Sequence, residues 1–219
     1  MHPPGFKVYL ASRSPRRREL LRQIGVEFEV ILLRERSPRG PDVSETVFPG
    51  ESAGDFVRRV CRAKTRAAWT HVEERGIRLY PVLSADTMVS VEGMLLGKPT
   101  GRADAVRMLQ SLSGKTHQVL TAVAMQFGER LEMAVSETTV RFRQLNAIEI
   151  GAYVDSGEPM DKAGAYAIQG RAAAFIPELR GSSSFWRAAQ NDEGAMLFFC
   201  GNDSFSFSQL SQRASMVVA

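Results

Sequence analysis

Apolar and polar positions follow two different periods along this chain, and the two periods alternate. Short apolar runs predict strands at 7–11, 26–33, 81–83, 88–91, 94–96, 118–127 and 133–142. Apolar positions spaced three and four apart predict helices at 16–24, from Ser52 onward, at 102–112 and from Asn146 to Val154. Strands that alternate with helices predict an α/β fold.

Residues with special backbone preferences mark the ends of these elements. Pro15 suits the first turn of a helix, and Gly25 suits the position just after its end. Ser52 followed by Asp55 is a capping signal for a long helix. The segment 37–50 is rich in Pro, Gly and Ser, so we predict an exposed loop there.

The composition fits a protein with a substantial core and no membrane span. The 219 residues are 44% hydrophobic, which suits one elongated domain or two small lobes. No apolar run approaches the roughly 20 residues of a membrane span, and no secretory signal is evident. We therefore expect a cytoplasmic protein. Cys61 and Cys200 lie far apart and the three histidines show no ligand spacing, so neither a disulfide framework nor a metal motif is predicted.

The chain carries a net charge of +4, and only five of its 28 basic residues are lysines. Arginine favours bidentate contacts with phosphate and carboxylate groups. The excess of arginine also fits a compositional bias of the genome. The positive charge suits a nucleic-acid surface and an anionic small molecule equally well.

An acid and a cation stand close together in the middle of the sequence. Asp86 follows the apolar run 81–83, which predicts a position at the mouth of a strand, and Lys98 follows the hairpin predicted at 88–96. An acid there is more often a turn former or a helix cap. With a cation beside it, the acid is also able to hold a metal or accept a proton from water, while the lysine neutralises phosphate oxygens.

Three further segments carry candidate binding residues. Ser12, Arg16 and Arg17 follow a strand and open a helix, where free N–H groups attract an anion and two arginines clamp a polyphosphate. Lys64 lies on a helix with Arg58, Arg59, Arg62 and Arg66, a pattern more typical of a solvated cationic face. Lys162 and Gln169 lie in the glycine-rich stretch 157–170. The Gln169 amide offers both a donor and an acceptor, so it is able to recognise a base edge.

Five segments, in this order, resemble the Maf family of nucleoside triphosphate pyrophosphatases, which includes the septum formation protein. They are Leu10-Ala11-Ser12-Arg13-Ser14-Pro15-Arg16-Arg17, Ser84-Ala85-Asp86-Thr87, Leu96-Gly97-Lys98-Pro99, Leu112-Ser113-Gly114-Lys115-Thr116-His117 and Lys162-Ala163-Gly164-Ala165-Tyr166-Ala167-Ile168-Gln169-Gly170. The resemblance implies an elongated mixed β-sheet flanked by helices, related to inosine triphosphate pyrophosphatases. We expect one domain over residues 1–219, with two lobes around a central cleft.

The resemblance also implies an activity and its residues. The expected reaction is hydrolysis of a nucleoside triphosphate to the monophosphate and pyrophosphate with Mg²⁺ or Mn²⁺. Asp86 matches the proton acceptor. Matches to substrate-binding positions are Ser12, Arg16, Arg17, Lys64, Thr87, Lys98, Lys162 and Gln169. Thr87 after Asp86 resembles the branch that acts on dTTP and UTP, so we expect those or modified pyrimidine nucleotides as substrates and Thr87 and Gln169 as readers of the pyrimidine.

The chain departs from the family pattern at two places. The family usually has an acidic pair after the second strand, whereas Leu33-Arg34-Glu35-Arg36 offers only Glu35, our expected partner of Asp86 at the metal. An enlarged loop follows at about 37–48. The family continues from a Gly-Ser-Tyr-Ser-like segment into a helix that contains Gly-Leu-Pro, whereas here Gly181-Ser182-Ser183-Ser184-Phe185-Trp186 leads into unrelated sequence. We therefore expect about 183–219 to be an atypical C-terminal tail. A homodimer is compatible with the family.

Two other functions fit the same residues. The altered acidic segment and tail fit a non-catalytic nucleotide sensor on this scaffold. The arginines of 58–66 fit a nucleic-acid-binding protein, but they lack the interleaved aromatic residues that single-strand binders use.

Overall fold

The computed structural model describes residues 7–34, 42–181, 187–190, 196–200 and 203–206. The elements run in the order β1 (Lys7–Leu10), α1 (Pro15–Gln23), β2 (Glu27–Val30), α2 (Ala53–Glu74), β3 (Val82–Val91), β4 (Met94–Leu96), α3 (Arg102–Leu112), β5 (Thr116–Phe127), β6 (Arg130–Arg141), α4 (Ala147–Asp155), the 3₁₀ turns η1 (Ala163–Ala165) and η2 (Arg171–Phe175), β7 (Glu178–Arg180), β8 (Arg187–Gln190), β9 (Met196–Cys200) and β10 (Asp203–Ser206).

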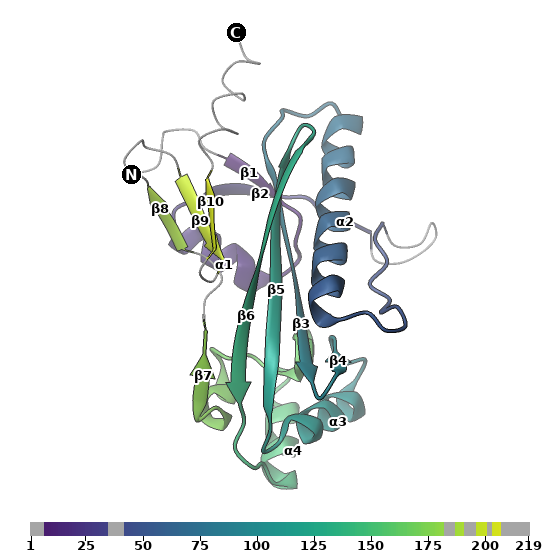
Figure 1. The fold of residues 1–219 in the computed structure, drawn as a ribbon, viewed down its shortest axis with the longest axis vertical. Helices are drawn as coiled ribbons and strands as arrows, with labels where there is room; N and C mark the ends of the chain where they lie inside the picture. The colour runs from purple at the N-terminus through teal and green to yellow at the C-terminus, as the bar shows by residue number, and fades with distance from the viewer. Residues whose placement is uncertain (1–6, 35–41, 182–186, 191–195, 201–202, 207–219) are drawn as a thin grey trace.

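A seven-stranded mixed sheet forms the framework of the molecule (Figure 1). Its strand order is β2-β1-β3-β5-β6-β7, and β4 pairs with β3. The β1–β2 and β1–β3 pairs are parallel, while the other pairs of this sheet are antiparallel. The prediction of an elongated mixed sheet flanked by helices is confirmed.

Three long strands run through the whole length of the molecule. Strands β5 and β6 pair along all 12 residues of each, and β3 pairs with β5 along nine residues. Other elements pack around these strands in two groups: α1, α2, β1 and β2 toward one end, and α3, α4, β4 and β7 toward the other (Figure 1). The strands therefore connect two packed regions without a break.

Alternation along the central strands gives the sheet two apolar faces. On one face, Met88, Leu120 and Ala122 pack against α2 through Val57 and Val60. Helix α2 begins where Ser52 and Asp55 predicted, because the Ser52 hydroxyl accepts from the Asp55 N–H at 3.1 Å. The opposite face packs against α1 through Leu20 and Leu21, with Leu83, Ala85 and Val123 from the sheet.

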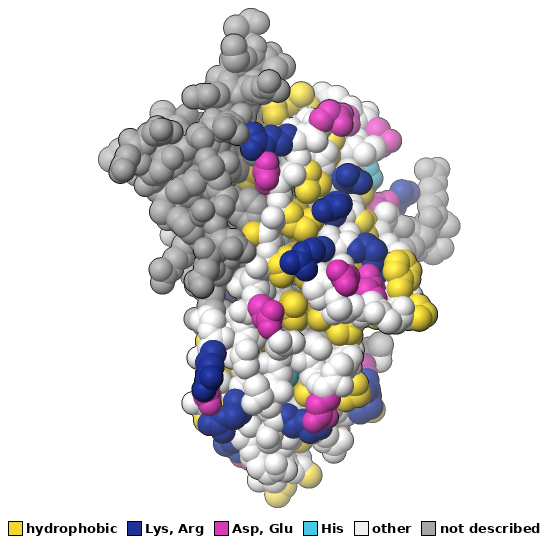
Figure 2. Space-filling model, viewed as in Figure 1, with side chains coloured by type: hydrophobic (Ala, Val, Ile, Leu, Met, Phe, Trp, Pro, Cys, Tyr) yellow, Lys and Arg dark blue, Asp and Glu magenta, His cyan; other side chains and the backbone are white. Residues whose placement is uncertain are grey.

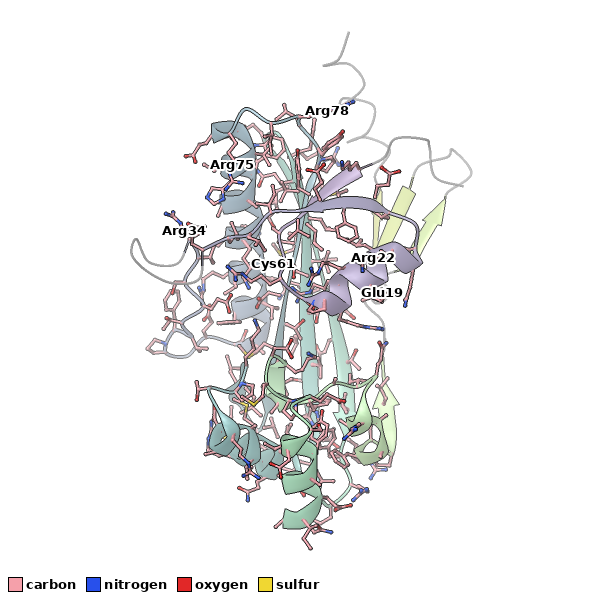
Figure 3. All side chains as sticks on the ribbon, turned by 180° about the vertical axis from the view of Figure 1, so that it is seen from behind. Glu19, Arg22, Arg34, Cys61, Arg75 and Arg78 are labelled. Carbon is pink, nitrogen blue, oxygen red and sulfur yellow. The ribbon has the colours of Figure 1, made fainter. Side chains whose placement is uncertain are left out.

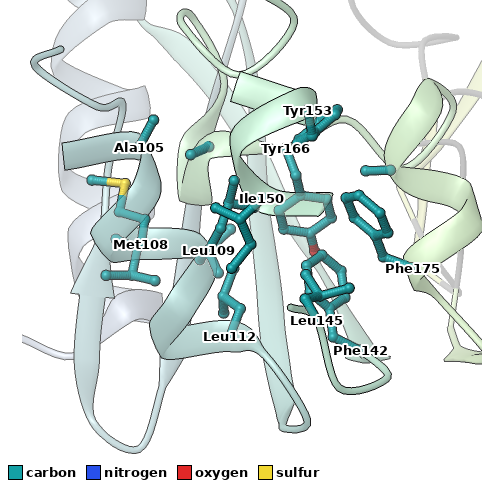
Figure 4. Close-up of a cluster of buried hydrophobic side chains, with 14 of the residues drawn as sticks. Ala105, Met108, Leu109, Leu112, Phe142, Leu145, Ile150, Tyr153, Tyr166 and Phe175 are labelled. Atoms are coloured by element: carbon teal, nitrogen blue, oxygen red, sulfur yellow. The ribbon is translucent and has the colours of Figure 1, made fainter. Parts of the chain in front are cut away.

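A third cluster fills the end of the molecule that carries α3 and α4 (Figure 4). Phe142 lies at its centre, edge-on to Tyr166 and Phe175 at centroid distances of 4.8 and 6.1 Å. Helix α4 is fixed by the Asn146 cap, and Glu149 closes the reciprocal capping box. The glycine-rich stretch 157–170 follows α4, and this part of the chain folds onto the cluster through turns that include η1 and η2.

The other predicted elements are confirmed with small shifts at their ends, except for the placement of Asp86. The prediction that Asp86 lies at a strand end is wrong, because Asp86 is the fifth residue of the ten-residue β3. Ser84 and Asp86 interrupt the apolar pattern and so suggest an end. Pairing of β3 with β5 holds this stretch in extended form despite its polar side chains.

The last described strands form a separate three-stranded antiparallel sheet of order β10-β9-β8. They belong to the stretch expected to be an atypical tail. Across the part of the chain that the structure describes, no helix is long and apolar enough to cross a membrane.

Candidate active site

The site lies where the sheet is split along one edge of β3. Strand β1 pairs with β3 only at Val82 and Leu83, and β4 pairs with it only from Val89 onward. Between these points β3 pairs with β5 on its other edge alone. The edge of residues 84–88, including Asp86, is therefore open, at the carboxyl end of parallel strand β1. Ligands of open α/β sheets bind at such positions.

Two carboxylates meet one ammonium group at this split. Lys64, on α2, lies with its Nζ 2.6 Å from Asp86 Oδ1 and 2.7 Å from Glu45 Oε1. The Lys64 and Asp86 side chains are only 17% and 10% exposed, whereas that of Glu45 is 48% exposed. Asp86 and Lys64 thus form the inner part of the site, and Glu45 forms its entrance.

The ionisation of these groups is mutually dependent. Burial alone lowers the pKa of Lys64, but the charges of Asp86 and Glu45 and their hydrogen bonds outweigh it and raise that pKa. Partial burial raises the pKa of Glu45, but the charge and hydrogen bond of Lys64, followed by the charges of Lys98 and Arg17, hold it below its ordinary value. Lys98 and Arg17 therefore lie within electrostatic reach of the Glu45 carboxylate.

Arg17 reaches the open edge of β3 from the opposite side. Its guanidinium donates to the Ala85 carbonyl at 2.6 Å and to the Ser12 hydroxyl at 3.1 Å. Helix α1 aims the side chain because Ser14 caps its first turn by accepting from the Arg17 N–H at 3.4 Å. Burial lowers the pKa of Arg17, and the Asp86 charge opposes that shift. Ser12 and Arg17, predicted together, are therefore in contact.

Thr87 and Asp86 project to opposite faces of the sheet, because successive strand residues alternate. Asp86 meets Lys64 on the α2 side, whereas the Thr87 hydroxyl lies 2.7 Å from that of Thr121 on β5. An Arg17 N–H also reaches the Thr87 hydroxyl at 3.4 Å. Thr87 is thus tied to Arg17 and to the sheet and does not touch the carboxylate pair.

The remaining predicted residues lie farther out. Arg16 is exposed in the first turn of α1. Lys98 is exposed after β4, and the Gly97 carbonyl next to it accepts from the Gly164 N–H at 2.9 Å. This bond joins the Lys98 loop to the segment that carries Lys162 and Gln169. Lys162 pairs with Asp161, and Gln169 is exposed.

Glu45 is a site residue that sequence reasoning missed. It lies in the segment 37–50, which was predicted only as an exposed loop. The loop is anchored by Asp42, which accepts from the Arg34 backbone N–H at 2.7 Å, and by Val43, which packs against the α2 cluster. The sequence held one indication of this contact: Val43 is an apolar residue within the predicted loop, two positions before Glu45. Glu35, predicted as the second carboxylate, lies outside the described residues.

The basic side chains of α2 do not form one uniform patch. Arg58, Arg62 and Arg66 are exposed at four-residue spacing. Arg59 instead pairs with Glu51 at 2.6 Å. On the face seen in Figure 2, basic side chains are interspersed with acidic and apolar ones.

The fold and the split define an α/β protein in which two carboxylates lie among cations at an open strand edge, an arrangement suited to phosphate chemistry. The family model described as Maf-like protein matches residues 7–185. The chain belongs to this family. The match ends where the sequence was expected to depart from its relatives.

Curated relatives cover most of the chain at about half identity. The dTTP/UTP pyrophosphatase of Nitrosomonas europaea is 52% identical over 182 residues, 83% of this chain and 88% of that protein. That of Aromatoleum aromaticum is 52% identical over 184 residues, 83% and 89% of the two chains. Among solved structures, the Staphylococcus aureus Ham1 protein matches with a TM-score of 0.41 and 15% identity, over 73% of this chain and 85% of that one.

Proposed function

We propose that this chain hydrolyses dTTP and UTP, or modified pyrimidine nucleotides of the same shape, to the monophosphate and pyrophosphate. The observation that carries the proposal is the Asp86–Lys64–Glu45 arrangement at the split of the sheet. Relatives about half identical to this chain, named dTTP/UTP pyrophosphatases, support the reaction and the substrates.

The residues of the split fit a divalent cation, which membership of the family leads us to expect. Lys64 already places a positive charge between two carboxylates. In the described ranges no group of three or more His, Cys, Asp or Glu side chains forms a metal site. Mg²⁺ is commonly held by one or two carboxylates together with substrate phosphates, so Asp86 and Glu45 would suffice for Mg²⁺ or Mn²⁺. When bound, the ion would neutralise phosphate charge.

Asp86 serves as the general base in this proposal. It accepts a proton from water as the water oxygen bonds to phosphorus and the anhydride bond between the α- and β-phosphates breaks. The leaving pyrophosphate takes the electron pair of that bond. Lys64 holds the carboxylate in place through the contact of 2.6 Å between its Nζ and Oδ1 of Asp86. A positioned general base contributes about 10²–10⁴-fold to rate.

The cations around the split bind the triphosphate. Arg17 uses two N–H groups for Ala85 and Ser12, which fixes its plane and leaves further donors for an anion. Lys98 and Arg16 add charge from the exposed side, where pyrophosphate leaves. Lys162 and Gln169 approach the nucleoside end, and Gln169 reads the pyrimidine through its amide. A base-reading role for Thr87 stays a prediction.

Pyrophosphate release from a panel of nucleotides tests the proposal. Purified protein with Mg²⁺ or Mn²⁺ is assayed on dTTP, UTP, CTP, dATP, GTP and 7-methyl-GTP. We expect monophosphate and pyrophosphate in equal amounts, with dTTP and UTP preferred by kcat/KM. Release of orthophosphate would contradict the assigned bond cleavage. Nucleotide binding without any turnover would contradict the enzyme and favour a sensor.

A further inference from the structure

Three polar side chains are buried directly behind the carboxylate–lysine pair. Cys61 and Thr65 lie on α2 and Ser84 lies on β3, and all three are fully buried. Figure 3 shows Cys61 on α2, next to the central strands. Apart from this cluster and the Lys64–Asp86 pair, α2 packs against the sheet through apolar residues such as Val57, Val60 and Met88. This polar cluster is therefore a local exception in an apolar interface.

The hydrogen bonds of the cluster form a closed set. The Thr65 and Ser84 hydroxyl oxygens lie 2.5 Å apart. Each hydroxyl is also placed to donate to the Cys61 carbonyl, at 2.8 Å for Thr65 and 3.1 Å for Ser84. The Cys61 Sγ lies 3.4 Å from the Ser84 hydroxyl. Burial raises the pKa of the Cys61 thiol to about 11, so it stays neutral. The cluster is thus satisfied without any charged member.

The position of the cluster relates it to the site. Thr65 follows Lys64 along α2, and Ser84 precedes Asp86 by two residues on the same face of β3. Cys61 and Lys64 are three residues apart, so they share one side of the helix. Hydroxyl pairs that cross from helix to strand fix the distance and the register between the two elements, whereas an apolar contact tolerates sliding. The cluster therefore sets where Lys64 meets Asp86.

We propose that Thr65 and Ser84 are positioning residues, which hold α2 in register with β3 so that the Lys64 ammonium meets the Asp86 carboxylate. The inference rests on the proposed function for its consequence in catalysis. Two satisfied buried hydroxyls add little net stability over apolar groups of the same shape. We therefore expect the pair to contribute to geometry more than to stability.

A double variant separates geometry from stability. Thr65→Val with Ser84→Ala removes both partners together, so no polar side chain of the pair is left unsatisfied. We expect its Tm to stay within a few degrees of the wild type or to rise. We expect kcat/KM to fall by about ten- to a hundredfold, because displacement of a catalytic group by about 1 Å costs on that order.

Two controls complete the experiment. Each single variant breaks the Thr65–Ser84 contact and leaves the remaining hydroxyl with the Cys61 carbonyl as its partner, so both singles should melt no higher than the double variant. Thr138→Val makes the same chemical change at a fully buried position on β6, a different strand from the β3 of Ser84 and Asp86. This variant should keep wild-type kcat/KM. Thr65→Ser retains the hydroxyl that Thr65→Val lacks, so it should keep most of the wild-type activity.

A readout independent of turnover distinguishes failure of this inference from failure of the proposed function. A crystal structure of the double variant measures the geometry without turnover: the distance from Lys64 Nζ to Asp86 Oδ1, 2.6 Å in the wild type, should lengthen by about 1 Å. Wild-type protein that releases no pyrophosphate would refute the proposed function, while this distance still tests the positioning. A double variant with an unchanged Lys64–Asp86 distance and unchanged kcat/KM would overturn the inference. So would a double variant that melts below both singles.

Discussion

The Lys64 ammonium nitrogen lies 2.6 Å from Oδ1 of Asp86, and both side chains are largely buried. Without the lysine, the carboxylates of Asp86 and Glu45 would face each other with less compensating charge. Lys64 holds the pKa of Glu45 below its ordinary value, so Lys64→Met should lower kcat/KM by about 10²-fold or more and move the ionisation of Glu45, and with it the acid limb of the pH–rate profile, to higher pH. Lys115→Met removes a partly exposed lysine paired with Glu92 and should leave the profile unchanged. An unshifted acid limb in the Lys64 variant would contradict the electrostatic role.

Removal of the proposed base tests the chemistry directly. Asp86→Asn keeps the shape of the side chain but removes its ability to take a proton at neutral pH. We expect kcat to fall about 10²–10⁴-fold while nucleotide is still bound. The loss is measured by pyrophosphate release, and binding by calorimetry with dTTP. Asp155→Asn, at an exposed aspartate paired with Arg102, serves as the control. Near-normal turnover by Asp86→Asn would remove Asp86 from its role.

Elements with a strong local signal were predictable from sequence. The Ser52 cap of α2 and the Asn146 capping box are short-range patterns, and both helices begin where these patterns place them. The β3–β4 hairpin was also predictable from its Glu92-Gly93 turn, at which both residues adopt positive φ. Local chemistry decides these features, so no knowledge of the rest of the fold was needed.

Features decided by tertiary contacts were not predictable in the same way. Asp86 continues a strand because β5 pairs beside it, which is not visible in the residues around Asp86. Glu45 enters the site because its loop packs on α2 and brings it to Lys64, 19 residues further along the chain. A loop has no periodicity from which such a contact follows. The same limit explains why the sequence did not suggest the Thr65–Ser84 pair.

Glu45 should set the requirement for divalent cation. Glu45→Gln removes one of the two carboxylates at the split and leaves the other in place. We expect the Mg²⁺ concentration for half-maximal activity to rise on the order of tenfold or more, since a bound cation loses a charged oxygen ligand. The measurement is a Mg²⁺ titration of pyrophosphate release at saturating nucleotide. Glu51→Gln changes an acid just after this segment, which pairs with Arg59, and should leave the midpoint as in the wild type.

Gly164 is required by both its backbone and its neighbour. Its φ is +70°, and a Cβ at this position would lie 2.8 Å from Cγ2 of the buried Val89. Gly164→Ala should lower the free energy of unfolding by about 2–4 kcal/mol, from backbone strain and overpacking together. Gly93 has a φ of +80° with open space around it, so Gly93→Ala should cost only the strain, about 1 kcal/mol. Urea unfolding of both variants measures the difference.

A double-mutant cycle isolates the contact between Gly164 and Val89. In a Val89→Ala background, Gly164→Ala should cost less than it does in the wild type, because the nearest methyl groups are gone. Equal costs in the two backgrounds would show that strain alone limits this position. The Gly164 N–H also donates to Gly97, next to Lys98, so the Gly164 variant should raise KM for dTTP as well.

His117 should make stability depend on pH. Its Nε2 lies 2.7 Å from the Tyr166 hydroxyl within the apolar cluster, and burial lowers its pKa to about 4, against an ordinary value of 6.5. Between these values the unfolded chain binds a proton that the folded chain does not, so stability falls as the pH falls through this window. The contribution is about 2–3 kcal/mol between neutral pH and about pH 4.5.

His117→Gln cannot titrate, so its free energy of unfolding should fall by that much less over the same range in urea denaturation. Tyr166→Phe removes the hydrogen bond but keeps the imidazole buried, and it should retain the wild-type slope. Parallel slopes for wild type and His117→Gln would show that the imidazole is protonated in the folded protein.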